Sequence, residues 1–199
     1  MTIASRARFV AINILAPLAL SWVLIGSLQA LFHGESRPAR HREFGTYGPL
    51  TLRLRLPGTH AGIEEPVVTV GRAGNATFVY LRLLPGSRAK VGIEFWGLSA
   101  AESPEFAVSS PDALITVQAS FPALYPAAGS PGWGLVSGPE QRRLLSGYLV
   151  AVDGEVRLRG PVAYEEPPRS PVYVGRNPLG GSYVSDYFTG TVVEAWHDF

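Results

Sequence analysis

The chain contains no cysteine among its 199 residues, so disulfide bonds, thiolate metal sites and a cysteine nucleophile are excluded. Histidine is also scarce. The four histidines, His33, His41, His60 and His197, are widely separated, which argues against a zinc site. The sequence has neither a G-x-S-x-G nucleophile elbow nor a phosphate-binding loop. We therefore expect a protein that is not an enzyme and has no cofactor.

Charge is absent from one long run, Phe9–Phe32. As a helix this run reaches ~36 Å, enough to cross a hydrocarbon core of ~30 Å. A cleaved secretory signal is the alternative, because Arg6 and Arg8 precede the run and Ala30 lies near its end. The apolar core of such a signal is only ~7 to 15 residues long, so we favour an uncleaved transmembrane α-helix.

The sequence divides into four parts: a short basic tail (1–8), a transmembrane helix (9–32), a polar linker (33–47) and a β-sandwich domain (48–199). Three arginines in the linker against two in the tail favour a cytoplasmic domain by the positive-inside rule. A basic tail, an apolar core and a long following domain are instead typical of a signal anchor. We expect a single-pass bacterial membrane protein with an extracytoplasmic, periplasmic domain.

The predicted span carries polar and small residues on a regular spacing. Asn13, Pro17 and Ser21 are four residues apart and share one helix face, and Gly26 and Ala30 allow close approach of another helix. Asparagine in hydrocarbon is costly without a partner, so this face predicts docking against other membrane helices. The alternative is a polar residue tolerated near the membrane edge. The span has no histidine, which disfavours haem or bacteriochlorophyll binding within it.

Beyond the linker the charge is mildly acidic. Residues 1–43 hold five arginines and two glutamates, whereas residues 44–199 hold 12 basic and 14 acidic residues. Nucleic-acid binders carry a dense basic face, so nucleic acid is not expected as a partner.

Short alternating runs fill the domain. Leu50–Leu56 places leucines on one face and Thr or Arg on the other, which predicts a half-buried strand. Asp153-Gly154 between two apolar runs predicts a hairpin, whereas residues 121–140 lack strand character. Further strands are predicted at 67–72, 76–84, 89–96, 105–109, 113–119, 144–152, 155–159, 172–174 and 189–196. The pattern predicts an all-β, antiparallel β-sandwich.

Three segments carry a family resemblance: Val150–Val156 (VAVDGEV), Val172–Ser182 (VYVGRNPLGGS) and Phe188–Val192 (FTGTV). They resemble the late strands of concanavalin A-like and laminin G-like sandwiches, in which a V-D-G turn precedes a G-x-N strand and a closing F-x-G-x-[IV] strand. The resemblance implies a jelly-roll sandwich. It does not select a function, because the family includes lectins, glycosidases, adhesion modules and structural domains.

The candidate site residues are few. Asp153, Asn177 and Asp186 are weak calcium candidates, in line with the calcium that some laminin G-like domains bind at loop edges. Trp133, Tyr125 and Tyr183 are candidates for stacking on a sugar or partner, and core packing is the alternative for such aromatics. The E-x-D-x-E pattern of the family's glucan-cleaving branch is absent. The pairs Glu64-Glu65 and Glu165-Glu166 flank prolines and are interpreted as solvated loop charge.

Two functions follow from these observations. The first is a non-catalytic accessory subunit of an integral membrane protein complex, with photosynthetic or respiratory complexes as possible hosts. Its partners would be the lipid bilayer and other membrane subunits. The alternative is a membrane-tethered carbohydrate-binding, lectin-like module with a glycan as its ligand.

Overall fold

The computed structural model describes residues 48–58, 62–96, 98–126, 147–162 and 171–197. Regular structure in these ranges is β-strand apart from one 3-10 turn, η1 (Pro122–Leu124). Across the same ranges, no helix is long and apolar enough to span a membrane.

The predicted tail, transmembrane helix and linker lie outside the described residues. The same is true of the five residues predicted to dock against other helices: Asn13, Pro17, Ser21, Gly26 and Ala30.

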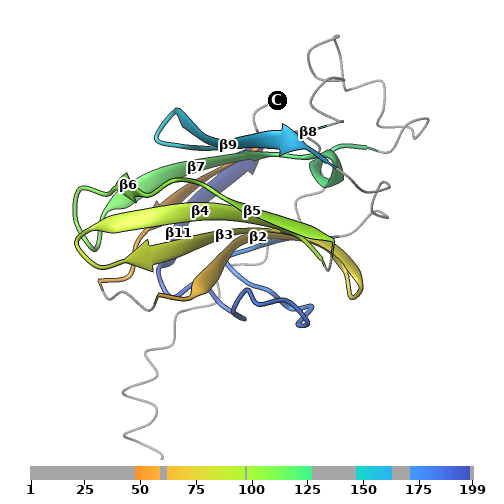
Figure 1. Cartoon of the computed structure of the whole chain (residues 1–199), viewed down its shortest axis with the longest axis horizontal. Coiled ribbons are helices and arrows are strands. Elements are labelled where there is room, and N and C mark those ends of the chain that lie inside the picture. The colour runs from red at the N-terminus through yellow and green to blue at the C-terminus, as the bar shows by residue number, and fades with distance from the viewer. Residues whose placement is uncertain (1–47, 59–61, 97, 127–146, 163–170, 198–199) are drawn as a thin grey trace, which may run out of the picture. The chain divides into compact units, whose positions relative to one another are not determined.

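The strands form two antiparallel sheets that stack as two layers (Figure 1). Sheet A has the order β11-β1-β7-β8-β9, with β1 (Leu50–Arg55), β7 (Leu114–Ser120), β8 (Gly147–Val152), β9 (Glu155–Pro161) and β11 (Thr191–His197). Sheet B has the order β10-β2-β3-β4-β5, with β2 (Glu64–Arg72), β3 (Asn75–Leu84), β4 (Arg88–Phe95), β5 (Ser99–Glu102) and β10 (Val172–Val174); β6 (Phe106–Ala107) pairs with β4. The predicted all-β, two-sheet antiparallel fold is confirmed.

The core lies between the two sheets because the strands alternate as predicted. In β1 the side chains of Leu50, Leu52 and Leu54 are fully buried, and Arg53 between them reaches Glu194 on the outer face. In β2, β3 and β4 most residues are buried on both faces, although the sequence of β4 still alternates. The outer face of sheet B is therefore also covered over part of its area.

One strand was not predicted and another is shorter than predicted. The unpredicted strand is β5, whose Ser-Ala-Ala-Glu sequence has low β propensity and forms a strand because β4 provides a hydrogen-bonding edge. The strand predicted at 105–109 shortens to the two residues of β6. Residues 127–140 of the predicted long loop lie outside the described ranges.

The hairpin predicted at Asp153-Gly154 is confirmed. Both residues have positive φ, 50° and 80°, the values that a two-residue turn with the twist of its strands requires. Asp153 fixes the turn further, since its Oδ1 accepts the Thr116 amide at 2.8 Å.

Candidate functional site

A long connection between β10 and β11, residues 175–190, crosses the outer side of sheet B; we call it the strap. It leaves the sheet at Gly175, whose amide donates to a β2 carbonyl and whose own carbonyl accepts the Phe188 amide, both at 3.0 Å. Arg176 and Tyr187 form an antiparallel bridge just beyond. The strap therefore leaves and rejoins the sandwich at one place, and in Figure 1 it forms the blue segment below β2 and β3.

Asn177 holds the strap together from inside. Its side chain is buried, its Nδ2 donates to the Val184 carbonyl and its Oδ1 accepts the Leu179 amide, both at 3.1 Å. Its backbone amide donates to the Asp186 carbonyl at 2.8 Å. One short side chain thus satisfies backbone groups on both arms of the strap, which fixes their spacing.

The underside of the strap is apolar and packs on sheet B. Val184 and Leu179 join Phe78 and Trp96 in a cluster separate from the main core. The Phe78 and Trp96 ring centroids are 5.7 Å apart. The strap approaches so closely at Gly181 that a Cβ there would lie 2.4 Å from the Trp96 Cζ2. A larger residue than glycine does not fit at this contact.

Two buried carboxylates fasten the strap to the strands. Glu94 on β4, 6% exposed, accepts a hydrogen bond from the Ser182 hydroxyl, which in turn accepts the Val184 amide. Glu65 on β2, 1% exposed, accepts both the amide and the hydroxyl of Thr189, at 2.9 and 2.7 Å.

The interpretation of Glu64-Glu65 as solvated loop charge was therefore wrong. Both residues belong to β2, and their side chains diverge to opposite faces, as the period of a strand requires. Glu65 is buried against the strap, whereas Glu64 pairs with Arg82. The second pair, Glu165-Glu166, lies outside the described residues.

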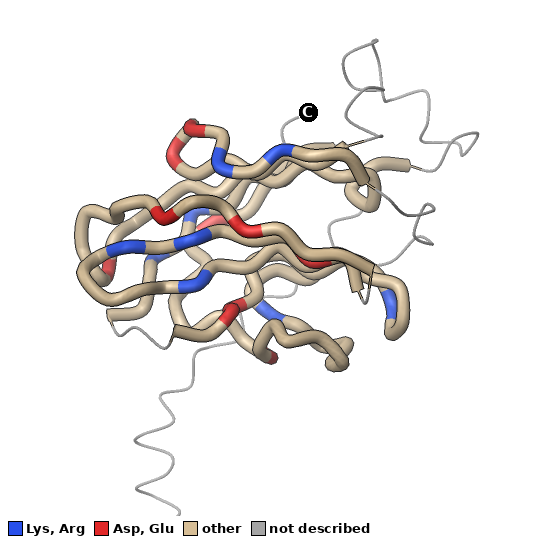
Figure 2. Tube along the Cα trace, viewed as in Figure 1, with Lys and Arg blue, Asp and Glu red and all other residues tan. Residues whose placement is uncertain are grey.

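Beside the strap, the outer face of sheet B carries a polar network of residues from four strands. The Arg82 guanidinium binds Glu64 at 3.2 Å and also Glu102, and Lys90 lies 3.5 Å from Glu102. The Tyr80 hydroxyl lies 3.4 Å from Glu102. These charged side chains are about a quarter exposed. Figure 2 shows the acidic and basic residues side by side on these strands.

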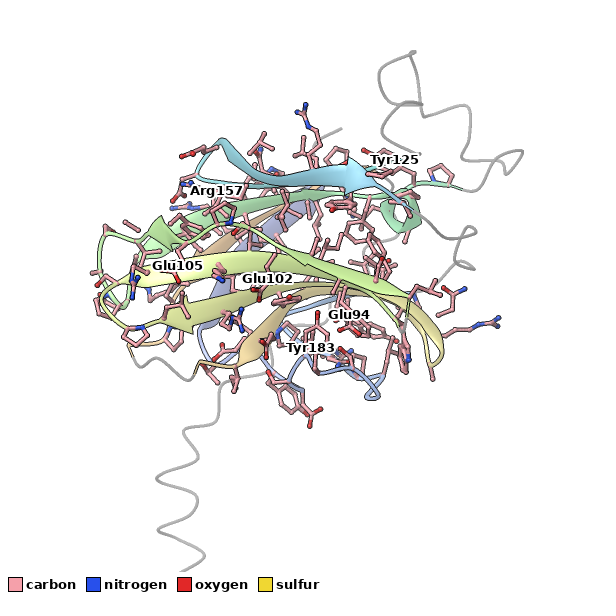
Figure 3. All side chains as sticks on the ribbon, in the orientation of Figure 1. Glu94, Glu102, Glu105, Tyr125, Arg157 and Tyr183 are labelled. Atoms are coloured by element: carbon pink, nitrogen blue, oxygen red, sulfur yellow. The ribbon has the colours of Figure 1, made fainter. Side chains whose placement is uncertain are left out.

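Tyr183 joins the strap to this network. Its hydroxyl lies 3.3 Å from that of Tyr80, and the two rings meet edge to face with centroids 5.7 Å apart. The Tyr80 ring packs directly over Gly92, which has room for it only because glycine lacks a Cβ. A Cβ on Gly92 would lie 2.0 Å from the Tyr80 Cζ. Figure 3 shows Tyr183 and Glu94 between sheet B and the strap, with Glu102 on β5 beside them.

Burial sets the protonation of these groups. Desolvation raises the pKa of Glu94, and the hydrogen bond from Ser182 partly offsets this. Burial also raises the pKa of Tyr80 and of Tyr183, and the charges of Glu102 and Glu64 add to both shifts. Both phenols are therefore neutral at physiological pH and act as hydrogen-bonding groups.

We expect the free energy of unfolding to contain a term from Glu94 that falls as pH rises above 4.5, the ordinary pKa of this carboxyl. Because the folded-state pKa is raised, this stability is fully present below the unfolded pKa and is lost as pH rises through the folded pKa. Glu94→Gln removes the titration but keeps an acceptor for Ser182. Urea titrations at a series of pH values between about 4 and 8 measure the free energy of unfolding. This free energy should fall less steeply with pH in Glu94→Gln than in the wild type.

Ser182→Ala is the matched variant for this prediction. It removes the donor that favours the ionised carboxylate and so raises the folded-state pKa further, and the upper end of the pH window should therefore extend to higher pH while its lower end stays in place. Equal slopes in the wild type and Glu94→Gln would show that Glu94 does not contribute this term.

The aromatic candidates have different positions. Tyr183 is 52% exposed at the edge of the polar network, as a stacking residue requires. Tyr125 is only 6% exposed, and its hydroxyl bonds that of Ser120 at 2.8 Å, so its ring belongs to the core. Trp133 lies outside the described residues.

Only two of the three calcium candidates, Asn177 and Asp186, lie together. Asp153 is bonded to β7 of sheet A, whereas Asn177 and Asp186 belong to the strap over sheet B. The Asn177 side-chain amide is already occupied within the strap. In the part of the chain that the structure describes, no group of three or more His, Cys, Asp or Glu could hold a metal ion.

The polar network was not predicted from the sequence. Its members lie far apart in the sequence and meet only through strand register, with Glu64 opposite Arg82 and Arg82 opposite Lys90. The available signal was the polar residues Arg82 and Lys90 within otherwise apolar runs, which indicates a second, outward-facing layer. No protein-family model matches the chain, and no curated protein matches it. The fold and the site geometry therefore carry the functional argument.

Proposed function

We propose that this chain is a non-catalytic accessory subunit of an integral membrane protein complex. A single N-terminal helix anchors it, and its β-sandwich docks on neighbouring subunits on the extracytoplasmic, periplasmic side. Photosynthetic and respiratory complexes are the hosts proposed. No cofactor and no nucleic acid take part.

The strap is the observation that carries this proposal. Tyr183 and Tyr187 are 52% and 69% exposed, on a loop whose underside, arms and base are all fixed by buried contacts. Tyrosine supplies contact area with few rotatable bonds, and an already ordered loop loses little conformational entropy on binding. Such a surface is suited to recognition.

The anchor part of the proposal rests on the sequence. The uncharged run at 9–32 supports the bilayer as one partner, and its face of Asn13, Pro17 and Ser21 supports contact with other membrane helices.

We also propose that the sandwich is of the concanavalin A-like or laminin G-like kind. The resembling segments at 150–156, 172–182 and 188–192 fall on the late strands of the two-sheet fold and on the strap between them. The two-sheet antiparallel architecture supports this assignment, and the V-D-G turn falls at the observed hairpin.

A carbohydrate-binding module is the second candidate function, and the surroundings of Tyr183 favour it. The half-exposed Tyr183 ring meets Tyr80, whose hydroxyl lies 3.4 Å from Glu102, and the side chains of Glu102, Arg82 and Lys90 are about a quarter exposed. A pyranose requires an aromatic face next to such polar groups.

Solubilisation in a mild detergent tests the first proposal. We expect the full-length protein to migrate with a large complex in native electrophoresis, and we expect Asn13→Leu or Gly26→Leu to weaken this co-migration by disturbing the helix contact. A glycan array in parallel tests the second candidate. A free monomer that binds a glycan, with binding lost in Tyr183→Ala, would reject the accessory-subunit proposal in favour of the lectin-like module.

A further inference from the structure

We infer that the strap docks through a patch of Tyr183, Asp186, Tyr187 and Ile63, and that this patch binds an arginine-bearing extramembrane loop of a neighbouring subunit. This inference rests on the proposed function, and it adds the docking face and the chemistry of the partner.

The patch is formed by one contact between distant parts of the chain. The Ser185 amide donates to the Glu64 carbonyl at 2.8 Å, which places the segment between the two tyrosines beside the start of β2. Ile63, just before β2, is 43% exposed, and Tyr183 and Tyr187 are still more exposed. Three of the eight exposed large hydrophobic side chains in the described residues therefore lie on segments that meet at one place. Clustered tyrosines with an aliphatic neighbour are typical of binding hot spots.

The charge around the patch determines the chemistry of the partner. Glu64, Glu94 and Glu102 all lie near enough to Tyr183 to raise its pKa further, after burial as the main cause. Arg82 and Lys90 are engaged by Glu64 and Glu102.

Two further charged residues near the patch belong to the strap itself. Arg176 is stacked on Tyr173, with its Cζ 4.8 Å from the ring centroid. Asp186, between the two tyrosines, is exposed. Glu94 is buried against Ser182, and Glu64 and Glu102 are engaged by Arg82 and Lys90, so the exposed Asp186 carboxylate is the charge that the patch itself offers to a partner. A cation is therefore favoured over the anionic headgroups of a membrane or over nucleic acid.

Arginine is the cation that suits both the tyrosine rings and the carboxylate of the patch. Its planar guanidinium stacks on tyrosine rings and binds a carboxylate through two parallel hydrogen bonds, whereas lysine offers a point charge. Among the described residues a guanidinium already stacks on an aromatic ring at Arg176 over Tyr173 and at Arg157 over Phe106.

A photo-crosslinking amino acid at position 187 of the full-length protein, activated in native membranes, tests this inference. We expect a covalent adduct whose partner peptide, identified by mass spectrometry, is an extramembrane segment of an integral membrane protein and contains arginine. The same probe at Val156, 47% exposed on sheet A, is the control and should give at least tenfold less adduct. A lipid adduct, a second copy of this chain, a peptide without arginine or no adduct at position 187 would overturn the inference.

Substitutions separate this inference from the proposed function. In the mild-detergent experiment we expect Asp186→Arg and Tyr187→Ala each to reduce co-migration at least tenfold, and Tyr187→Phe to retain it because the ring is kept. Co-migration that both substitutions leave intact would overturn the docking patch but leave the proposed function in place. A wild-type protein that never co-migrates would reject both.

Discussion

Phe78→Ala is expected to lower the free energy of unfolding by about 3–5 kcal/mol, the usual cost of removing a fully buried aromatic ring. Phe78 has no exposed surface and lies between sheet B and the strap, in contact with Trp96. The loss combines the transfer free energy of the ring with the cavity left under the strap. Val184 cannot fill that cavity, because its backbone is held by Asn177 and Ser182.

Urea denaturation of the purified protein measures this loss. Tyr187→Ala removes a ring of similar size from the strap that covers Phe78, but the Tyr187 side chain is 69% exposed, so we expect a change within about 0.5 kcal/mol. The pair separates burial under the strap from the mere presence of an aromatic residue. Equal effects of the two substitutions would contradict the described packing.

Gly92→Ala is expected to destabilise the protein by about 1–3 kcal/mol, although alanine normally suits a strand better than glycine does. The reason is steric, since the added methyl group would lie 2.0 Å from the Tyr80 Cζ. The ring has to move, and its hydroxyl then leaves Glu102 and Tyr183. The sign of the effect is opposite to the one that intrinsic propensity predicts.

A double-mutant cycle with Tyr80→Ala isolates this clash. Once the ring is absent, Gly92→Ala should lower the free energy of unfolding only slightly. The loss in the double variant should therefore be at least about 1 kcal/mol smaller than the sum of the losses in the two single variants. Gly58→Ala is the control, because a Cβ there meets no atom within 4 Å. Strict additivity would show that Tyr80 does not rest on Gly92.

Much of the fold could be predicted from local sequence. The leucine alternation of β1 and the Asp153-Gly154 turn depend on residues within one strand or one hairpin, where period and turn chemistry are local properties. β5 was missed because its Ser-Ala-Ala-Glu sequence carries no such signal, and the pairing edge that makes it a strand lies on β4.

The candidate site could be predicted only in part. Tyr183 was proposed as an exposed aromatic and is half exposed, but Tyr125, proposed on the same grounds, is buried with its hydroxyl on Ser120. Residue type is the same in both cases. Their exposure differs because Tyr125 follows η1 into the core between the sheets, whereas Tyr183 lies on the strap outside sheet B.

The sequence by itself determined that this is a two-sheet, antiparallel all-β protein without cysteine, since alternation, turn residues and composition act over a few residues. Only the tertiary structure decided how its carboxylates are used. Glu64 meets Arg82 across 18 positions, Ser182 meets Glu94 across 88 and Thr189 meets Glu65 across 124. Strand order and register bring these groups together, and burial then requires each carboxylate to have a hydrogen-bond donor.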